Sequence, residues 1–292
     1  MIPRDVLKEI RRIQITTSRM VTDVFAGQYQ SVFKGKGMEF DEVREYIPGD
    51  EIRSIDWNVT ARTGHPYVKK FTEERELTVM LLLDMSASSF FGTRSQQKAH
   101  LAARICSVLA LSAIKNNDKV GFIAFTDKIE KFIPARKGLR HVLRIIRDAL
   151  YFKPAQAGTD IVLALEYLNR VTTRKTVSFI ISDFFAPDFK KMLAVANKRH
   201  DVVAVTITDP AELELADVGI VKLFDPETRR DFIVDSSDKK IRSQYQANAL
   251  RRSRERILLF HSVNVDCIDV RTDAGYSKSL LKFFRARERR MR

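Results

Sequence analysis

Four oxygen-bearing side chains lie at or near the ends of apolar runs in this sequence, and a fifth lies between these runs, so that all five could share one ligand. The run LLLDMSASS carries Asp84, Ser86 and Ser88 at its end, and the run VSFIISD ends in Asp183. Between them, the segment AGTD places Thr159 at the start of a predicted helix. Two carboxylates and three hydroxyls form an all-oxygen set, which suits a small hard cation, Mg²⁺ above all, or another divalent cation. We therefore predict a metal site made of these five side chains.

The spacing D-x-S-x-S also has a second interpretation, because serine-rich turns after a strand often cap the following helix. The positions of the other residues favour the metal site, since both aspartates end hydrophobic runs and the threonine lies in a glycine-containing loop. A site for a softer metal is not predicted, because no two histidines have the spacing of a ligand pair. The five histidines are His65, His100, His141, His200 and His261.

Strands and helices alternate after residue 77, which predicts an α/β domain with a mostly parallel sheet. The run over 77–83 is almost continuously apolar, as expected for a strand that is buried on both faces. Further strands are predicted over 120–125, 177–181, 202–207 and 263–270, and helices over 95–116, 139–150, 159–171, 189–198, 238–260 and 277–289. In such sheets ligands bind beyond the carboxyl ends of strands where the strand order reverses, and both aspartates stand at such ends.

The chain is predicted to contain two parts. Residues 1–76 form an N-terminal extension with a helix over 4–26 followed by a β-hairpin. Residues 77–292 form the α/β domain, with a hairpin insertion at about 218–235. The last predicted strand and helix can extend the same sheet, so a single α/β domain is expected after the extension.

The extension contains a dense group of charged residues around a tight turn. The tripeptide PGD at 48–50 predicts this turn, with Pro48 fixing φ and Gly49 supplying a permissive corner. One interpretation makes the charged hairpin a recognition surface. In the other, Trp57 and Tyr46 pack against its underside and the charges face water. We expect three of its charged residues to form structural pairs: Arg44, Arg53 and Asp56.

Taken together, DMSAS, GTD and IISD resemble the metal-ion-dependent adhesion site of von Willebrand factor A domains. Its five positions correspond to Asp84, Ser86, Ser88, Thr159 and Asp183. The resemblance implies a Rossmann-like, six-stranded sheet with helices on both faces, and a Mg²⁺ ion held partly through water. The sixth position of the ion is left to an Asp or Glu of a partner. Two aspartates roughly balance the charge of the ion, so an incoming carboxylate still meets a strong local cation.

A longer stretch of the sequence is similar to a more specific family within this group. The segment GKGMEFDEVREYIPGDEIRSIDWNVTAR, with ITDP and DPETRRDFIVD further on, is similar to the MoxR-associated von Willebrand factor A-like family, which is named as a domain of unknown function. The similarity runs from about Phe33 to the last predicted helix. It implies a MoxR-type AAA+ ATPase as a partner, and a chaperone-like accessory role in ATPase-driven maturation or remodelling of other proteins. Some relatives look membrane-anchored ahead of this region, whereas this sequence shows no such segment.

Two phenylalanine pairs lie next to the predicted site in the sequence. Phe90 and Phe91 follow the first loop, and Phe184 and Phe185 follow Asp183. An apolar rim around a cation is typical of a protein-docking site, in which aromatic side chains supply binding energy and the metal supplies register. In the alternative interpretation, these rings close the upper edge of the sheet.

The formal net charge of +14 is unevenly distributed. The net charge is 0 over residues 1–80, +11 over 81–200 and +3 over 201–292. The basic middle and the tail RARERRMR could bind nucleic acid, an anionic membrane surface or an acidic protein, or form solvated helix faces. No basic cluster is interleaved with aromatic residues as a base-stacking surface requires, so nucleic acid is kept only as the alternative partner.

Catalysis is not predicted. A phosphotransferase that used Asp84 would need a second acid at position 86, where this sequence has Ser86. No glycine-rich phosphate cradle follows a strand, and no serine has a histidine and an acid in a plausible arrangement. A metal-dependent hydrolase is the weaker alternative, because no base is obvious beside the ion.

The chain is expected to be soluble and cytoplasmic. Its apolar runs are far shorter than the roughly 18 residues of a membrane-spanning helix, and the start MIPRDVLKEIRR mixes acids and bases, unlike a secretory signal. Cys106 and Cys267 both lie in apolar stretches, which favours buried thiols in a reducing compartment over a disulfide.

Overall fold

The computed structural model consists of two compact units, which are described separately. The larger unit contains the described residues from Thr78 onward, and the smaller unit contains those up to Leu77. The helix predicted over 4–26 lies outside the described residues. The structure describes residues 39–72, 76–92, 96–225 and 230–291.

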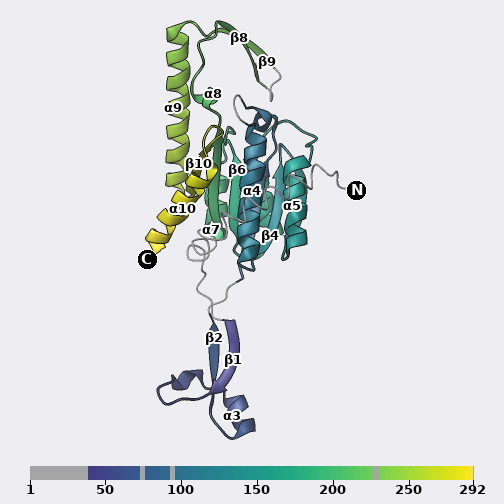
Figure 1. Ribbon diagram of the computed structural model, residues 1–292, viewed down its shortest axis with the longest axis vertical. Helices are drawn as coiled ribbons and strands as arrows, with labels where there is room; N and C mark the ends of the chain where they lie inside the picture. The colour runs from purple at the N-terminus through teal and green to yellow at the C-terminus, as the bar shows by residue number, and fades with distance from the viewer. Residues whose placement is uncertain (1–38, 73–75, 93–95, 226–229, 292) are drawn as a thin grey trace. The chain divides into compact units, whose positions relative to one another are not determined.

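The larger unit is built on a six-stranded sheet with the strand order β10-β7-β6-β3-β4-β5 (Figure 1). Neighbouring strands are parallel except for β4 and β5, which pair antiparallel. The predicted α/β class and mostly parallel six-stranded sheet are confirmed. The strands are β3 (Thr78–Asp84), β4 (Lys119–Phe125), β5 (Ile129–Arg136), β6 (Val177–Ser182), β7 (Asp201–Thr208) and β10 (Asp266–Arg271).

The central strands β3, β6 and β7 are buried along almost their whole length, because helices cover both faces of the sheet. The chain leaves β3 toward β4 and β5 on one side, and then returns to β6 on the other side of β3. The strand order therefore reverses between β3 and β6. The carboxyl ends of these two strands, where Asp84 and Asp183 stand, flank the switch point at which open α/β sheets bind ligands.

Helices α4 and α5 pack against each other on one face of the sheet, in front of it in Figure 1. Helices α6 and α7 cover the opposite face, where their apolar side chains meet Met80 and Leu82 of β3. Both cysteines are free, and burial in α4 raises the pKa of the Cys106 thiol to about 12. The helices are α4 (Lys98–Lys115), α5 (Leu139–Tyr151), α6 (Ile161–Val171), α7 (Lys190–Arg199), α9 (Lys239–Ser262) and α10 (Tyr276–Met291).

The segment between β7 and β10 carries the predicted hairpin. The short helix α8 (Pro210–Leu213) follows β7, and then β8 (Ile220–Asp225) and β9 (Arg230–Asp235) pair antiparallel. Figure 1 shows this hairpin beyond the end of the sheet at which α8 follows β7. Its apolar side chains are largely exposed, including those of Ile220 and Ile233.

The smaller unit pairs β1 (Glu39–Glu45) with β2 (Tyr67–Thr72) and places the short helix α3 (Trp57–Thr63) between them. Asp56 caps α3 by accepting hydrogen bonds from two of its backbone N–H groups, and also lies 3.4 Å from the ammonium of Lys69. Gly64 ends the helix with a φ of 78°, the left-handed conformation that glycine adopts without strain. Helix α3 was not expected from the sequence.

The polar pairs expected in this unit form in part. The guanidinium of Arg44 binds both carboxylate oxygens of Asp50, at 2.8 and 2.6 Å, beside the turn in which Gly49 has a φ of 113°. Arg53 has no ion pair among the described residues. Trp57 is 66% exposed, which contradicts the interpretation that this ring packs under the hairpin.

Candidate functional site

The carboxyl end of β3 holds Asp84 in a defined orientation. The residue is only 2% exposed. Its Oδ1 accepts a hydrogen bond from the backbone N–H of Ser86 at 2.9 Å, and its Oδ2 accepts one from the hydroxyl of Ser182 at 2.6 Å. Because Ser182 ends the neighbouring strand β6, the second bond ties the two strand ends together. The Asp84 carboxylate is therefore preorganised by its own backbone and by the adjacent strand.

Ser86 and Ser88 bring their hydroxyls together beside Asp84. Ser86 precedes the 3-10 turn Ala87–Phe90, and its Oγ lies 3.1 Å from the Oγ of Ser88. Ser86 is buried and Ser88 is half-buried. The hydroxyl of the next residue, Ser89, donates to the backbone carbonyl of Asp84 at 3.3 Å. The hydroxyls of Ser86 and Ser88 are thus close enough to share one ligand.

Asp183 follows β6 and is oriented by a strained turn. Phe184 has a φ of 59°, in the left-handed region that a phenylalanine rarely adopts. In this turn the N–H of Phe184 donates to the hydroxyl oxygen of Ser182 at 3.0 Å, and the N–H of Phe185 donates to Oδ1 of Asp183 at 3.1 Å. Backbone strain of this kind is frequent at ligand sites, where the surrounding structure maintains it.

The loop that carries Thr159 is bound to the same end of the sheet. The N–H of Ala87 donates to the carbonyl of Ala157 at 2.8 Å, which joins this loop to the turn after Asp84. The N–H of Asp160 donates to the carbonyl of Thr126, just after β4, at 2.9 Å. Asp160 also caps α6 by accepting from the N–H of Leu163. Thr159, half-buried, therefore stands between two residues that are anchored beside the Asp84 turn and the end of β4.

A buried lysine that was not expected from the sequence lies behind the aspartates. Lys98, the first residue of α4, is 2% exposed. Its ammonium donates to Oδ2 of Asp183 at 2.7 Å and to Oε1 of Glu212 at 2.5 Å. Glu212 belongs to α8, where its other carboxylate oxygen accepts from the N–H of Asp209 in a capping box. This lysine therefore links Asp183 to the segment that leads into the hairpin.

Burial and neighbouring charges shift the pKa values of Asp84, Lys98 and Glu212. Burial and the negative charge of Asp183 together raise the pKa of Asp84 to about 6. Burial alone would lower the pKa of Lys98, but the carboxylates of Asp183 and Glu212 reverse this and raise it above its ordinary value. Burial raises the pKa of Glu212, and Lys98 opposes that shift. The lysine is therefore held protonated, while Asp84 is in an environment that favours an additional positive charge.

The donor set of the five predicted residues fits a small hard cation. All of its donors are oxygen atoms. Three carboxylates (Asp84, Asp183 and Glu212) and one ammonium (Lys98) give a net charge of −2 when ionised, which matches a divalent ion. Among the described residues, no group of three or more His, Cys, Asp and Glu side chains could hold a metal. A cation here would therefore rely on the serine and threonine hydroxyls as well as the two carboxylates.

The aromatic rim forms in part. Phe90, Phe91 and Phe185 are exposed, so their predicted role in partner binding stays a prediction. The prediction is wrong for Phe184. This residue is only 5% exposed, and its ring packs at 5.7 Å from that of Phe189 and at 5.0 Å from that of Phe260. The positive φ of Phe184 turns its side chain into the core and leaves that of Phe185 at the surface.

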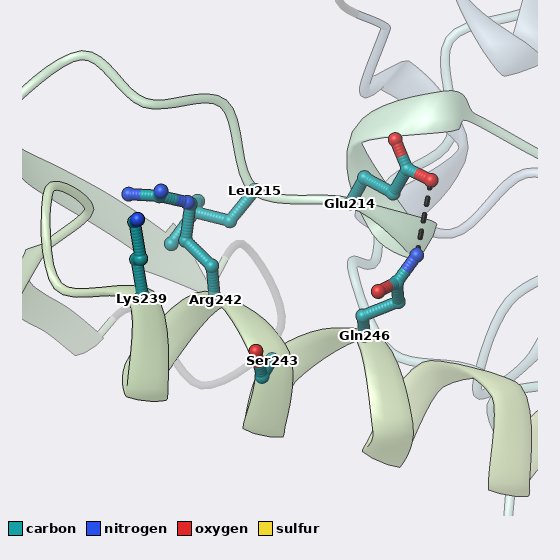
Figure 2. Close-up of a pocket in the computed structure, with 6 residues that line it drawn as sticks. All are labelled: Glu214, Leu215, Lys239, Arg242, Ser243 and Gln246. Carbon is teal, nitrogen blue, oxygen red and sulfur yellow. Dashed lines mark hydrogen bonds between the residues drawn. The ribbon is translucent and has the colours of Figure 1, made fainter.

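A separate, open hollow lies between the end of α8 and the start of α9 (Figure 2). In Figure 2, Lys239 and Arg242 project from α9 toward the same side, and the amide of Gln246 donates to the Glu214 carboxylate at 3.1 Å. Arg242 is already paired with Asp217 at 3.0 Å. The hollow shares no residue with the Asp84 group, and two of its polar side chains, Glu214 and Gln246, bond to each other. We assign it no function.

Residues 42–256 match the family described as "Protein of unknown function DUF58". The chain belongs to this family. It is 30% identical over 285 residues to the uncharacterized protein Rv1480 of Mycobacterium tuberculosis, an alignment that covers 96% of this chain and 89% of that protein. It is 25% identical over 175 residues to the uncharacterized protein YeaD of Bacillus subtilis, which covers 60% of this chain and 42% of YeaD.

Solved structures with some likeness include BatB from Bacteroides thetaiotaomicron, at 15% identity and a TM-score of 0.45 over 73% of this chain and 99% of that one. An aerotolerance-related membrane protein from Bacteroides fragilis gives 17% identity and a TM-score of 0.47, over 74% and 100%. The SpRpn10 von Willebrand factor A domain gives 10% and 0.38, over 70% and 94%. These scores are too low to bear on function. Among the described residues, no helix is both long and apolar enough to cross a membrane.

Proposed function

We propose that this protein is a metal-dependent protein-interaction module. In this proposal a Mg²⁺ ion is held by Asp84, Ser86, Ser88, Thr159 and Asp183, and engages an Asp or Glu side chain of a partner. The observation that carries the proposal is the meeting of the Asp84 turn, the Asp183 turn and the Ala157–Asp160 loop at the switch point of the sheet. The raised pKa of Asp84 supports it, because a cation beside the two buried carboxylates would relieve their repulsion.

We propose binding rather than catalysis. Hydrolysis assisted by a metal needs a base near the ion to activate water. Lys98 places an amine against Asp183, but its two carboxylate partners keep it protonated, so it cannot accept a proton. A bound cation would hold Asp84 ionised as a ligand rather than leave it free as a base. The arrangement is better suited to holding a charge than to moving a proton.

The proposed partner is a MoxR-type AAA+ ATPase, or a client protein of such an ATPase that offers the carboxylate. This part of the proposal depends on the resemblance of the segment over 35–62 to MoxR-associated proteins. The role would be that of a chaperone-like accessory in maturation or remodelling of other proteins. Nucleic acid is the alternative partner. A cytoplasmic location agrees with this role and is part of the proposal.

The test begins with the cation. Isothermal titration calorimetry should detect Mg²⁺ binding to the intact chain, and Asp183→Asn should weaken that binding by about 10- to 100-fold. Asp188→Asn is the matched control, because it removes one exposed carboxylate from the same loop and should leave Mg²⁺ affinity unchanged. Equal affinity of the wild-type protein and Asp183→Asn would rule out the site.

The second part of the test concerns the partner. Tagged protein should retain the MoxR-type ATPase encoded in the same genome when Mg²⁺ is present and release it when EDTA is added. Added salt distinguishes nucleic acid from the ATPase as the partner, because binding through phosphate contacts weakens steeply as the salt concentration rises. Retention that is insensitive to EDTA and to Asp84→Ala would show that the cation does not hold the partner.

A further inference from the structure

The ring of Phe185 is surrounded by positive charge. The guanidinium of Arg252 lies 5.6 Å from the ring centroid, that of Arg256 lies 6.0 Å away, and the ammonium of Lys98 lies 5.8 Å away. Arg252 and Arg256 are four residues apart in α9, so they stand one above the other on the same helix face. Phe185 is 41% exposed, which leaves part of this group open to solvent.

The two arginines are positioned relative to the candidate site through Asp183. Arg256 donates to the backbone carbonyl of Asp183 at 2.7 Å, and Phe185 donates its N–H to the Asp183 side chain. Arg252 is exposed, and neither arginine has a carboxylate partner among the described residues. Unlike the charge of Lys98, these two charges are not balanced within the described chain. We call Phe185, Arg252 and Arg256 the arginine platform.

The rest of α9 favours an acidic partner. The helix contains seven basic residues and one acidic residue, and among the described residues only Arg242 forms an ion pair with a carboxylate. Unpaired surface charges of one sign attract partners of the opposite sign and raise the rate of encounter. The adjoining candidate cation site is proposed to take a carboxylate, which favours an acidic polypeptide over nucleic acid as the partner of these arginines.

We propose that the arginine platform binds an acidic polypeptide segment, and that this segment is continuous with the one whose carboxylate the cation takes. This inference rests on the proposed function and adds a second requirement. The recognised segment carries at least two acidic residues, one for the cation and one for Arg252 and Arg256, with an apolar side chain able to lie against Phe185. Arginine suits this role because its planar guanidinium binds a carboxylate through two parallel hydrogen bonds.

A fluorescein-labelled octapeptide of glutamates with one central phenylalanine is a suitable probe, measured by fluorescence anisotropy with Mg²⁺ at low salt. The double variant Arg252→Gln/Arg256→Gln should weaken binding about tenfold. Arg254→Gln is the matched control, since it removes one charge from the opposite side of the same helix, and it should change affinity less than twofold. Arg252→Gln alone should reproduce part of the loss, and because Arg252 is exposed it should not disturb folding, which circular dichroism would check.

The outcomes separate this inference from the proposed function. If the arginine variants weaken binding but EDTA and Asp183→Asn do not, the platform stands and the cation role fails. If EDTA and Asp183→Asn weaken binding but the arginine variants do not, the platform is overturned and the cation role stands. A loss in Arg254→Gln equal to that in Arg252→Gln would mean unspecific attraction and would overturn the platform. Labelled single-stranded DNA that binds more tightly than the peptide, and is lost in the same variants, would reassign the surface to nucleic acid.

Discussion

Lys98 and Arg252 both place a positive charge near the ring of Phe185, but their surroundings are opposite. Lys98 is almost fully buried and donates to two carboxylates, whereas Arg252 is exposed and has no carboxylate partner among the described residues. A buried charge is tolerated only when it is paired, so the pairing of Lys98 is a condition for folding. An exposed charge stays hydrated without a partner and remains available for binding. The contrast assigns the inner cation to structure and the outer one to recognition.

The largest expected effect comes from removing the inner cation. Lys98→Met leaves the carboxylates of Asp183 and Glu212 buried without their shared ammonium, and should lower the free energy of unfolding by about 3–5 kcal/mol. Urea denaturation followed by circular dichroism measures this change. The matched variant Arg252→Met replaces an outer cation by the same side chain and should change stability by less than about 0.5 kcal/mol. Similar losses of stability in Lys98→Met and Arg252→Met would show that the buried and the exposed cation do not differ in their structural role.

A second test uses the two adjacent phenylalanines. Phe184→Ala removes a ring that packs against Phe189 and Phe260, and should destabilise the fold by about 3–4 kcal/mol. Phe185→Ala removes an exposed ring and should cost about 1 kcal/mol or less, while weakening binding of the acidic peptide. Thermal unfolding and the anisotropy assay measure the two effects. A large loss of stability in Phe185→Ala would show that this ring belongs to the core.

Burial also governs a histidine far from the site. Burial, followed by the charges of Arg199 and Lys175, lowers the pKa of His200 from 6.5 to about 4. The unfolded chain therefore takes up a proton as pH falls below about 6.5, while the folded chain does not until about pH 4. The stabilisation is complete above pH 6.5 and should be lost over that window, by about 2–3 kcal/mol.

Urea midpoints between pH 7 and pH 4 measure this effect. His200→Asn should remove this contribution, so the stability difference between the wild-type chain and the variant should fall by about 2–3 kcal/mol from pH 7 to pH 4. The substitution also alters the hydrogen bonds to Thr172 and Thr176. His100→Asn changes an exposed histidine and should leave the dependence as it is in the wild-type chain. Equal pH dependence of the wild-type chain and His200→Asn would mean that folding does not lower the pKa of His200.

Much of this fold was predictable because continuous apolar runs identify strands buried on both faces. The runs at 77–83 and 177–181 match β3 and β6 to within one residue at either end. The strand β5 was missed because it lies at the sheet edge, is only partly buried and contains Pro134, which cannot donate to a ladder. Helix α8 was also missed, although D-P-x-E at 209–212 is a capping box with proline at the first helical position.

Sequence reasoning located the oxygen-bearing side chains of the candidate site but not its counter-charges. The two aspartates and two serines could be found because they follow apolar runs, and Thr159 because it lies in a glycine-containing loop between those runs. Lys98 could not be found by the same rule, since one lysine at the start of a helix usually faces water. The available signal was that α4 is apolar around most of its circumference, so a charge in its first turn has little solvent to reach. The opposite orientations of Phe184 and Phe185 depend on one positive φ, which their identical residue type cannot reveal.

A third cation, Arg256, extends the comparison between Lys98 and Arg252 and gives the smallest expected effect. Arg256 is half-buried and donates to the backbone carbonyl of Asp183, so it lies between Lys98 and Arg252 in both exposure and pairing. Arg256→Met should cost about 1–2 kcal/mol of stability, as expected for the loss of a hydrogen bond from a charged donor. Urea denaturation should therefore rank the methionine variants as Lys98, Arg256 and Arg252, from the most to the least destabilised.

Peptide affinity should follow a different order, because Arg252 is expected to matter for binding and almost not at all for folding. If the loss of stability and the loss of peptide affinity rank the three variants in the same order, Arg252 and Arg256 affect binding only by stabilising the Asp183 turn. Lys98 would then not differ in role from the two arginines.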